Sequence, residues 1–346
     1  MFVFFTTGSI HGTRFFLYPV SQILSSFQYL FIITLKLYVM AKISKSSSNY
    51  FLSYMQTQID SLKAMNRFGT AANYERTMKS FSEFMKGKDV SFRFFNESLV
   101  DRYNSYLVHK KLSRNSVSFY MRVLRAVYNK AVRQRLTKQN NPFENVYTGI
   151  DKTRKRSVGE FVISKLYKMK LSHDSSLELA RDVFIFSFLT RGMSFVDIAF
   201  LKKNSIQDGK IYYNRHKTGQ LMCIKIVPSI ERIINRYMDK TDSFVFPFIE
   251  TDDVVMSYKQ YRLAINRYNK SLYKLSEMLD AGVHITSYVA RHSWATTARK
   301  HNVPISIISA GLGHTTETTT QIYLATIENT LVDNANDLII DNLDLM

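Results

Sequence analysis

Apolar residues recur at helical spacing through most of this chain of 346 residues, and this periodicity restricts it to a mainly helical fold. Phe51, Met55, Ile59 and Leu62 form the first such series, and similar series follow up to about residue 133. Glycine and proline, which interrupt helices, occur only 12 and 5 times. The sequence therefore predicts a folded, helix-rich protein rather than a disordered or fibrous one.

The second half of the chain breaks this periodicity once. Two β-rich runs, GKIYYN and LMCIKIV, flank the turn His216-Lys217-Thr218-Gly219, which predicts a β-hairpin. Helical patterns precede and follow it, among them 286–301, 304–312 and 316–327. The predicted fold class is mainly α with a small β-hairpin or sheet.

The length of the chain allows two ordinary domains, each with its own core. An Asn-Asn-Pro turn and a basic run between residues 136 and 157 are typical of a linker, which places a boundary near residue 150. The predicted parts are an apolar extension (1–39), a helical domain (40–150), a basic linker (151–157), a second domain (158–330) and a tail (331–346).

Residues 1–39 are crowded with Phe, Leu and Ile and carry only Arg14 and Lys36 as full charges. A membrane segment or signal sequence is one interpretation. Several Ser and Gln residues interrupt the apolar run, and no clear small-residue cleavage site follows it. We therefore favour translation starting at Met40, with a surface-packed extension as the third alternative.

The charge of the chain predicts a polyanionic partner. Its 47 Lys and Arg against 28 Asp and Glu give a net charge of +19, and DNA or RNA is the first candidate, before an anionic membrane surface. The helix expected after Ser113 contains no acidic residue, and its basic side chains are DNA-contact candidates: Arg114, Arg122, Arg125 and Arg133. A solvated basic face explains these four residues equally well.

Metal and nucleotide cofactors are not expected. Cys223 is the only cysteine, which excludes a disulfide framework and a Cys-rich metal site. Asp182 and Asp197 do not belong to a carboxylate cluster at ligand spacing, and no GxxxxGK[ST] loop is present. We expect a cytoplasmic protein that uses amino-acid side chains alone.

Chemistry-bearing residues occur in four separate segments: Arg291 in TSYVARHSWATTARK, His314 in LGH, Tyr323 nine residues later, and Lys217 in the hairpin turn. These residue types suit attack on a phosphodiester. An arginine clamps the non-bridging oxygens, a tyrosine acts as nucleophile, and a lysine protonates the leaving 5′ oxygen. A histidine can donate to the phosphate or accept the phenolic proton.

The segment RHSWATTARKHNVPISIISAGLGHTTETTTQIYLA resembles the second box of the tyrosine recombinase, or phage integrase, family, and HKTG at 216–219 resembles its hairpin lysine. The resemblance extends from about residue 48 to 330. It implies a helical, SAM-like DNA-binding domain and an α+β catalytic domain that close on DNA as a C-shaped clamp. The activity implied is site-specific recombination through a 3′-phosphotyrosine intermediate, which integrates or excises a mobile element. The implied partners are double-stranded DNA attachment sites, further copies of the chain in a tetrameric synapse, and DNA-bending accessory proteins.

Two positions depart from the family pattern. Tyr288 stands where the HxxR motif has histidine, and it is a candidate phosphate contact. Ser194 stands where the first-box arginine is expected, three residues before Asp197. Arg191 lies one helical turn earlier and is the expected replacement, because residues three apart share a helix face. The segment RGMSFVDIAFLKK resembles the sequences of integrases from Bacteroidetes mobile elements.

Two alternatives to a recombinase remain. Tyr288 and Ser194 are consistent with a DNA-binding protein whose active site has decayed, whereas a type IB topoisomerase would use the same chemistry without strand exchange. The apolar and acidic tail ending in LIIDNLDLM suits docking into a neighbouring protomer, and a solvated tail explains it as well.

Overall fold

The structure is a computed structural model that describes residues 49–151, 157–171, 175–314 and 316–321, together with the backbone of 2–6, 15–19 and 322–324. The chain divides into two compact units, Met1–Asp151 and Lys152–Met346. The predicted linker residues 152–156 and the predicted tail, 331–346, lie outside the described residues. Each unit is described by itself.

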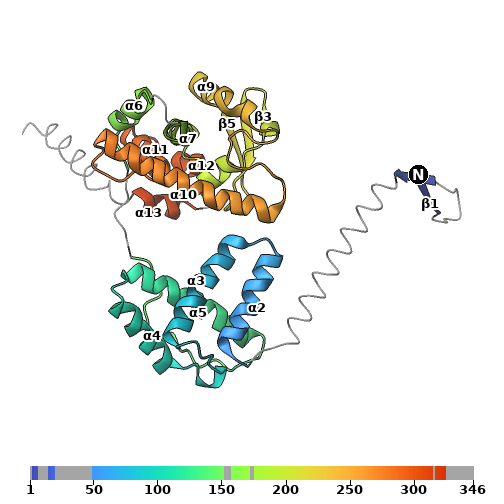
Figure 1. The fold of residues 1–346 in the computed structure, drawn as a ribbon, viewed down its shortest axis with the longest axis vertical. Helices are drawn as coiled ribbons and strands as arrows, with labels where there is room; N and C mark the ends of the chain where they lie inside the picture. The colour runs from blue at the N-terminus through green and yellow to red at the C-terminus, as the bar shows by residue number, and fades with distance from the viewer. Residues whose placement is uncertain are drawn as a thin grey trace, which may run out of the picture. The chain divides into compact units, whose positions relative to one another are not determined.

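Within its described residues, the N-terminal unit contains the helices α2 (Phe51–Ala64), α3 (Phe68–Phe84), α4 (Glu97–His109) and α5 (Arg114–Arg133), with a short 3-10 turn, η1 (Phe92–Phe94) (Figure 1). Side-chain caps fix two of the helix starts. Asn96 accepts a hydrogen bond from the Leu99 N–H at 3.0 Å, and Ser113 accepts one from the Ser116 N–H at 3.3 Å.

Aromatic side chains dominate the core of this unit. Phe51 and Phe95 stack with ring centroids 4.1 Å apart, and Phe81 meets Tyr103 edge-on at 5.0 Å. All four side chains are fully buried. Such pairs stabilise the core beyond simple area burial, so the predicted helical periodicity corresponds to one shared aromatic core.

Part of the predicted apolar extension forms a short antiparallel strand pair, β1 (Phe2–Thr6) and β2 (Phe15–Pro19). No helix among the described residues is long and apolar enough to cross a bilayer.

The C-terminal unit packs its helices around α7 (Ser175–Leu189), which Figure 1 shows nearly end-on between its neighbours. The consecutive residues Val183, Phe184, Ile185 and Phe186 are all at most 2% exposed, so α7 is buried on every side. The other helices of this unit are α6 (Glu160–Lys168), α8 (Phe195–Ala199), α9 (Pro228–Tyr237), α10 (Val254–Leu279), α11 (Val289–Lys300), α12 (Ile305–Leu312) and α13 (Glu317–Leu324).

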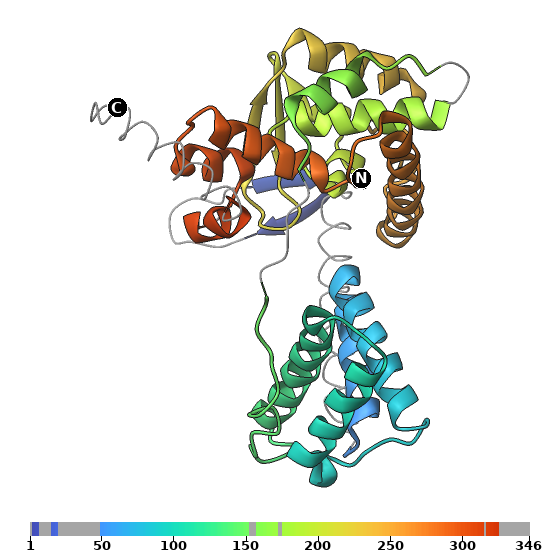
Figure 2. The same ribbon diagram turned by 90° about the vertical axis from the view of Figure 1, so that its left-hand side faces the viewer.

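A small antiparallel sheet with the order β3-β4-β5 completes this unit: β3 (Ile206–Gln207), β4 (Lys210–Asn214) and β5 (Leu221–Lys225). Two short 3-10 turns, η2 (Lys203–Ser205) and η3 (Met238–Lys240), flank the sheet and α9. The turn of the β4–β5 hairpin lies beside the C-terminal helices, as the side view in Figure 2 shows. The predicted fold class, mainly α with a small β-sheet, is confirmed.

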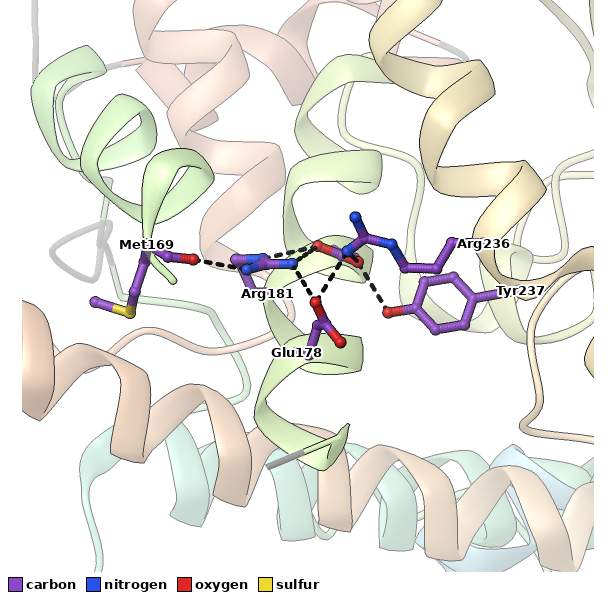
Figure 3. A network of polar contacts seen from close by, with 6 residues as sticks. Met169, Glu178, Arg181, Arg236 and Tyr237 are labelled. Atoms are coloured by element: carbon purple, nitrogen blue, oxygen red, sulfur yellow. Dashed lines mark hydrogen bonds and ion pairs between the residues drawn. The ribbon is translucent and has the colours of Figure 1, made fainter. Parts of the chain in front are cut away.

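An ion network centred on the buried Arg181 and Asp182 connects α7 to α9 and to the end of α6 (Figure 3). Asp182 receives Arg181 Nε at 2.8 Å, Arg236 Nη1 at 2.6 Å and the Tyr237 hydroxyl at 2.8 Å. Arg181 also donates to the Met169 carbonyl at 2.6 Å and to Glu178 at 3.2 Å. Every charge in this network therefore has an opposite charge beside it, which makes its burial tolerable.

Candidate active site

Arg291 is a buried arginine, 3% exposed, in the first turn of α11. Its Nη1 donates to the Gly192 carbonyl at 2.9 Å, its Nη2 donates to the Leu312 carbonyl, and Nη2 lies 3.1 Å from Nε2 of His314. The guanidinium thus joins α11 to two other segments, one about 100 residues earlier in the sequence and one about 20 residues later.

The turn before α8 must come unusually close to Arg291. Gly192 has a φ of +73°, and a Cβ at this position would lie 2.7 Å from Arg291 Cα and 2.8 Å from its Cγ. Only glycine satisfies both the left-handed backbone and this contact. The Gly192 carbonyl is thereby brought to the guanidinium that it holds.

His314 follows the end of α12. Gly313 terminates that helix in the left-handed conformation, and the His314 N–H then donates to the Ser309 carbonyl at 3.0 Å. The Nδ1 atom of His314 lies 2.8 Å from the hydroxyl oxygen of Thr320 on α13. Because a guanidinium can only donate, Nε2 accepts from Arg291, and Nδ1 carries the proton and donates to Thr320.

The electrostatic surroundings of His314 favour this neutral form. Burial, together with the positive charges of Arg291, Arg215 and Lys217, lowers the pKa of His314 to about 4. The imidazole is therefore uncharged at neutral pH and keeps its lone pair on Nε2.

Lys217 lies exposed in the turn between β4 and β5. Its positive charge is one of the causes that lower the pKa of His314. The buried carboxylate of Asp197 holds this turn, because its Oδ1 accepts from the His216 N–H at 2.7 Å. The Oδ2 of the same carboxylate accepts from the Ser194 hydroxyl at 2.6 Å. One acidic side chain therefore connects the start of α8 to the lysine turn.

Arg215 belongs to the same cluster, and the sequence reasoning missed it. The side chain is 6% exposed and its Nη1 donates to the Gly313 carbonyl. Its Nε has no hydrogen-bond partner within the described part of the chain. The alternation Ile211, Tyr213, Arg215 along the strand was the available signal, because every second residue faces the same side of a sheet.

Arg191 and Ser194 do not share a helix face as expected, because α7 ends at Leu189 and α8 begins only at Phe195. Arg191 follows α7 with a φ of +60°, and its side chain makes no ion pair with any residue whose side chain is described. Burial is the main reason that the pKa of Tyr213 is raised, and the charges of Arg291, Arg215 and Arg191 act against that rise. Arg191 thus shares an electrostatic environment with Arg291, whereas the Ser194 hydroxyl is committed to Asp197.

The two candidate tyrosines are placed less completely. Tyr323 lies on α13, one turn after Thr320, and its side chain is outside the described residues. Tyr288 directly precedes α11, is 47% exposed, and meets the His292 ring edge-on at 5.0 Å.

The four arginines predicted to contact DNA lie along α5 in the N-terminal unit. Arg114 stacks over the Tyr147 ring at 3.9 Å and pairs with Asp151 at 3.4 Å, and Arg125 donates to Thr148 at 2.8 Å. Arg122 lies between these two and contacts the Ser118 carbonyl at 3.4 Å, and Arg133 is exposed at the C-terminal end of the helix. Arg114, Arg122 and Arg125 thus lie beside the segment 147–151.

The acids considered for a metal site have other partners. Asp182 accepts hydrogen bonds from Arg181 and Arg236, and Asp197 accepts them from the Ser194 hydroxyl and the His216 N–H. Within the described ranges, no three His, Cys, Asp or Glu side chains gather as a metal site would require.

Comparison with known proteins gives two family matches. Residues 50–148 match the model of the phage integrase SAM-like domain, and residues 160–329 match the model of the phage integrase family. A tyrosine recombinase XerC of Halalkalibacterium halodurans is 24% identical over 276 residues, which cover 76% of this chain and 89% of the relative. A tyrosine recombinase XerC of Rickettsia canadensis is 22% identical over 269 residues, covering 74% and 86%.

Solved structures share the fold. A lambda integrase dimer bound to a COC′ core site matches with a TM-score of 0.57 and 15% identity, over 79% of this chain and 95% of that chain. The Tn1549 transposon integrase in complex with a circular intermediate DNA matches with a TM-score of 0.55 and 15% identity, over 80% and 95%.

Proposed function

Because this chain belongs to the phage integrase family of tyrosine recombinases, we propose that it cleaves and rejoins DNA through Tyr323. The phenolic oxygen attacks a backbone phosphorus, the bond to the 5′ oxygen breaks, and a 3′-phosphotyrosine forms. The reverse reaction, with a 5′ hydroxyl as nucleophile, rejoins a strand. The phosphotyrosine retains the energy of the broken bond, so no nucleotide is consumed.

The observation that carries this proposal is a cluster of cations where carboxylates are scarce. Arg291 and Arg215 are buried within one hydrogen bond of the 312–314 segment, and the charge of Lys217 reaches His314. Neither Arg215 nor Lys217 forms an ion pair with any described carboxylate. Burying such a cluster of cations without a bound anion costs stability. The cluster is suited to bind a phosphate whose negative charge grows in the transition state.

Each residue has a role in this scheme. Arg291 and Arg191 bind the non-bridging oxygens, and Lys217 protonates the leaving 5′ oxygen. His314 in its neutral form can accept the phenolic proton at Nε2, if Arg291 turns its Nη2 toward the phosphate. Tyr288 contributes a weaker hydrogen bond to the phosphate than a cation would, because its hydroxyl is an uncharged donor.

The partners follow from the same chemistry. We infer that the chain binds double-stranded attachment sites and associates with further copies on DNA, as a tetramer in the synapse. A solved structure with a similar fold supports this proposal: in it, lambda integrase is bound as a tetramer to a Holliday junction. In this scheme the catalytic residues belong to 158–330, and the basic side chains of α5 contact DNA phosphates: Arg114, Arg122, Arg125 and Arg133. The reaction takes place in the cytoplasm and integrates or excises a mobile element.

A catalytically decayed DNA-binding protein is the second candidate, and Ser194 and Tyr288 favour it. One experiment separates the two. The full chain is incubated with a pool of duplex oligonucleotides of random central sequence, and adducts that survive detergent are isolated and sequenced.

An active recombinase gives protease-sensitive adducts on a defined DNA sequence, and the decayed protein gives none. Tyr323→Phe keeps the ring and removes only the nucleophilic oxygen, so it should bind the selected DNA normally and form no adduct. Adducts from the Phe variant at normal yield would remove Tyr323 as the nucleophile. A topoisomerase would instead relax supercoiled plasmid and never join two different duplexes.

A further inference from the structure

Two buried arginines of the C-terminal unit have opposite surroundings. Arg181, 8% exposed, lies between the carboxylates of Asp182 and Glu178 and the Met169 carbonyl (Figure 3). Arg215, 6% exposed, donates from its guanidinium to the Gly313 carbonyl and has no carboxylate partner among the residues described. Burial of a cation without an acid does not stabilise a fold. The position of Arg215 therefore requires an explanation other than stability.

Arg215 joins two segments that carry site residues. Its backbone belongs to the lysine turn, because its N–H donates to the Gln220 carbonyl at 2.8 Å and its carbonyl accepts from the Gly219 N–H at 2.7 Å. Its guanidinium crosses to the Gly313 carbonyl. The packing is close, since a Cβ on Gly313 would lie 3.2 Å from Arg215 Cδ. The Lys217 turn and the His314 turn are thus held together by one side chain.

A chain of hydrogen bonds continues from the His314 turn. Arg291 donates to Nε2 of His314, and Nδ1 of His314 donates to Thr320. Thr320 is fully buried on α13, the helix that carries Tyr323. The orientation of the imidazole therefore links the guanidinium of Arg291 to the helix of the proposed nucleophile.

We propose that Arg215 is a positioning residue for DNA cleavage: it braces the Lys217 hairpin against the His314 turn and so fixes the Arg291–His314–Thr320 chain on the nucleophile's helix. This inference rests on the proposed function of the site. It adds a residue that touches neither the nucleophile nor the leaving group in the scheme given above.

The proposal has an electrostatic consequence that can be measured in the free protein. Among the described side chains, the charged and polar groups around His314 include Arg291 on α11, Arg215 and Lys217 on the hairpin, and the Thr320 hydroxyl on α13. Burial is the largest cause that lowers the pKa of His314, and the three cations add to it. A protonated imidazole has no lone pair to accept from Arg291. The hydrogen bond between Arg291 and His314 is therefore lost at any pH at which His314 gains a proton. Removing the charge of Arg215 should therefore raise the pH at which the chain breaks.

The test compares Arg215→Gln, Arg215→Lys and the matched control Arg181→Gln in the full-length protein. The ring nitrogens of His314 are titrated by NMR in the free protein, with His314→Gln to assign the signal. The rate of adduct formation is measured in single turnovers, from pH ~5 to 8 where histidine can titrate, on the DNA selected from the random pool.

Arg215→Gln should raise the pKa of His314 and slow adduct formation by about 10- to 100-fold, the range for loss of one hydrogen bond to a charged group. The loss should deepen toward acid pH. Arg215→Lys retains the charge and a donor, so it should keep the low pKa of His314 and recover part of the rate. Arg181→Gln breaks the network of Figure 3 and should lower the unfolding midpoint without changing the pKa of His314.

An unchanged pKa of His314 in Arg215→Gln, or an unchanged rate per folded molecule, would overturn the proposal. So would an equal rise of the His314 pKa in Arg181→Gln, because the effect would then be general loosening. If the unaltered protein forms no adduct on any DNA, the proposed function fails and the role of Arg215 in cleavage fails with it, whereas the titration of the free protein still shows whether Arg215 holds the His314 turn.

Discussion

Gly192 offers the sharpest test of the site geometry, because one added methyl group would meet backbone. In Gly192→Ala the new Cβ would lie 2.7 Å from Arg291 Cα, 2.8 Å from its Cγ and 2.9 Å from its Cβ. Neither the α11 backbone nor the turn can move without disturbing the 2.9 Å hydrogen bond from Arg291 Nη1 to the Gly192 carbonyl. The substitution therefore changes the position of the arginine without changing its chemistry.

The magnitude has two parts that a matched control separates. Left-handed backbone costs a non-glycine residue about 1–2 kcal/mol, and overpacking typically costs about 1–3 kcal/mol more. Gly209 has a φ of +68° and nothing within 4 Å of its would-be Cβ. Gly209→Ala should therefore show the backbone part alone, about 1–2 kcal/mol, and Gly192→Ala should lose about 2–5 kcal/mol in total.

The assay uses the only tryptophan of the chain, Trp294, which lies on α11 and packs against Gly311 of α12. Its fluorescence during urea unfolding reports the stability of the C-terminal unit. Adduct formation is then compared at a temperature where both variants are folded. We expect Gly192→Ala to lose at least tenfold in rate, about 1.4 kcal/mol in the barrier, and Gly209→Ala to keep it. Equal losses of stability with an unchanged rate in Gly192→Ala would refute the assigned contact.

Three further predictions concern the proposed chemistry and the basic helix. Arg191→Ala should slow cleavage at least a hundredfold, about 3 kcal/mol, and Ser194→Ala should cost little, because the Ser194 hydroxyl is already bonded to Asp197; the reverse order would return the first-box role to position 194. Adduct formation should be unchanged by EDTA and need no ATP, because the cations proposed to bind the phosphate are side chains; activity lost on chelation and restored by magnesium would overturn this mechanism. DNA affinity should fall steeply as the salt concentration rises. Replacing Arg122, Arg125 and Arg133 by Gln should flatten the slope of log K against log salt by about 0.9 per lost phosphate contact. An unchanged slope would identify these three arginines as part of a solvated face.

Local sequence was enough for much of the fold. Periodicity predicted the helices of the N-terminal unit, and the β-rich runs around Lys217 predicted β4 and β5. The helical pattern of the sequence after Ser194 runs from about Phe195 to Lys202, but α8 ends at Ala199. Lys202 instead forms a bridge with Phe244, and the Lys203 N–H donates to the Ser243 carbonyl at 2.9 Å. These partners lie some 40 residues away, so no local signal could reveal them.

The site shows the same limit. Spacing and residue type selected Arg291, His314 and Lys217, and the structure brings Arg291 against His314 with the charge of Lys217 close by. The role of Arg215 could not be predicted, because its partner Gly313 is 98 positions away. The same holds for Asp197, which connects Ser194 to the turn at His216. Motifs indicate which residues perform chemistry, and long-range packing decides which residues support them.

The uncompensated burial of Arg215 also bears on the history of this chain. A copy released from selection for cleavage would gain stability by exchanging such an arginine for an apolar side chain of similar volume. Drift would therefore erase the cation cluster before it damaged the aromatic core. This chain retains Arg215 with its unpartnered Nε, beside Arg291 and Lys217. The fold therefore bears a cost in stability that an anion bound beside Arg215 would offset, and this is what we expect of a site that still binds a DNA phosphate.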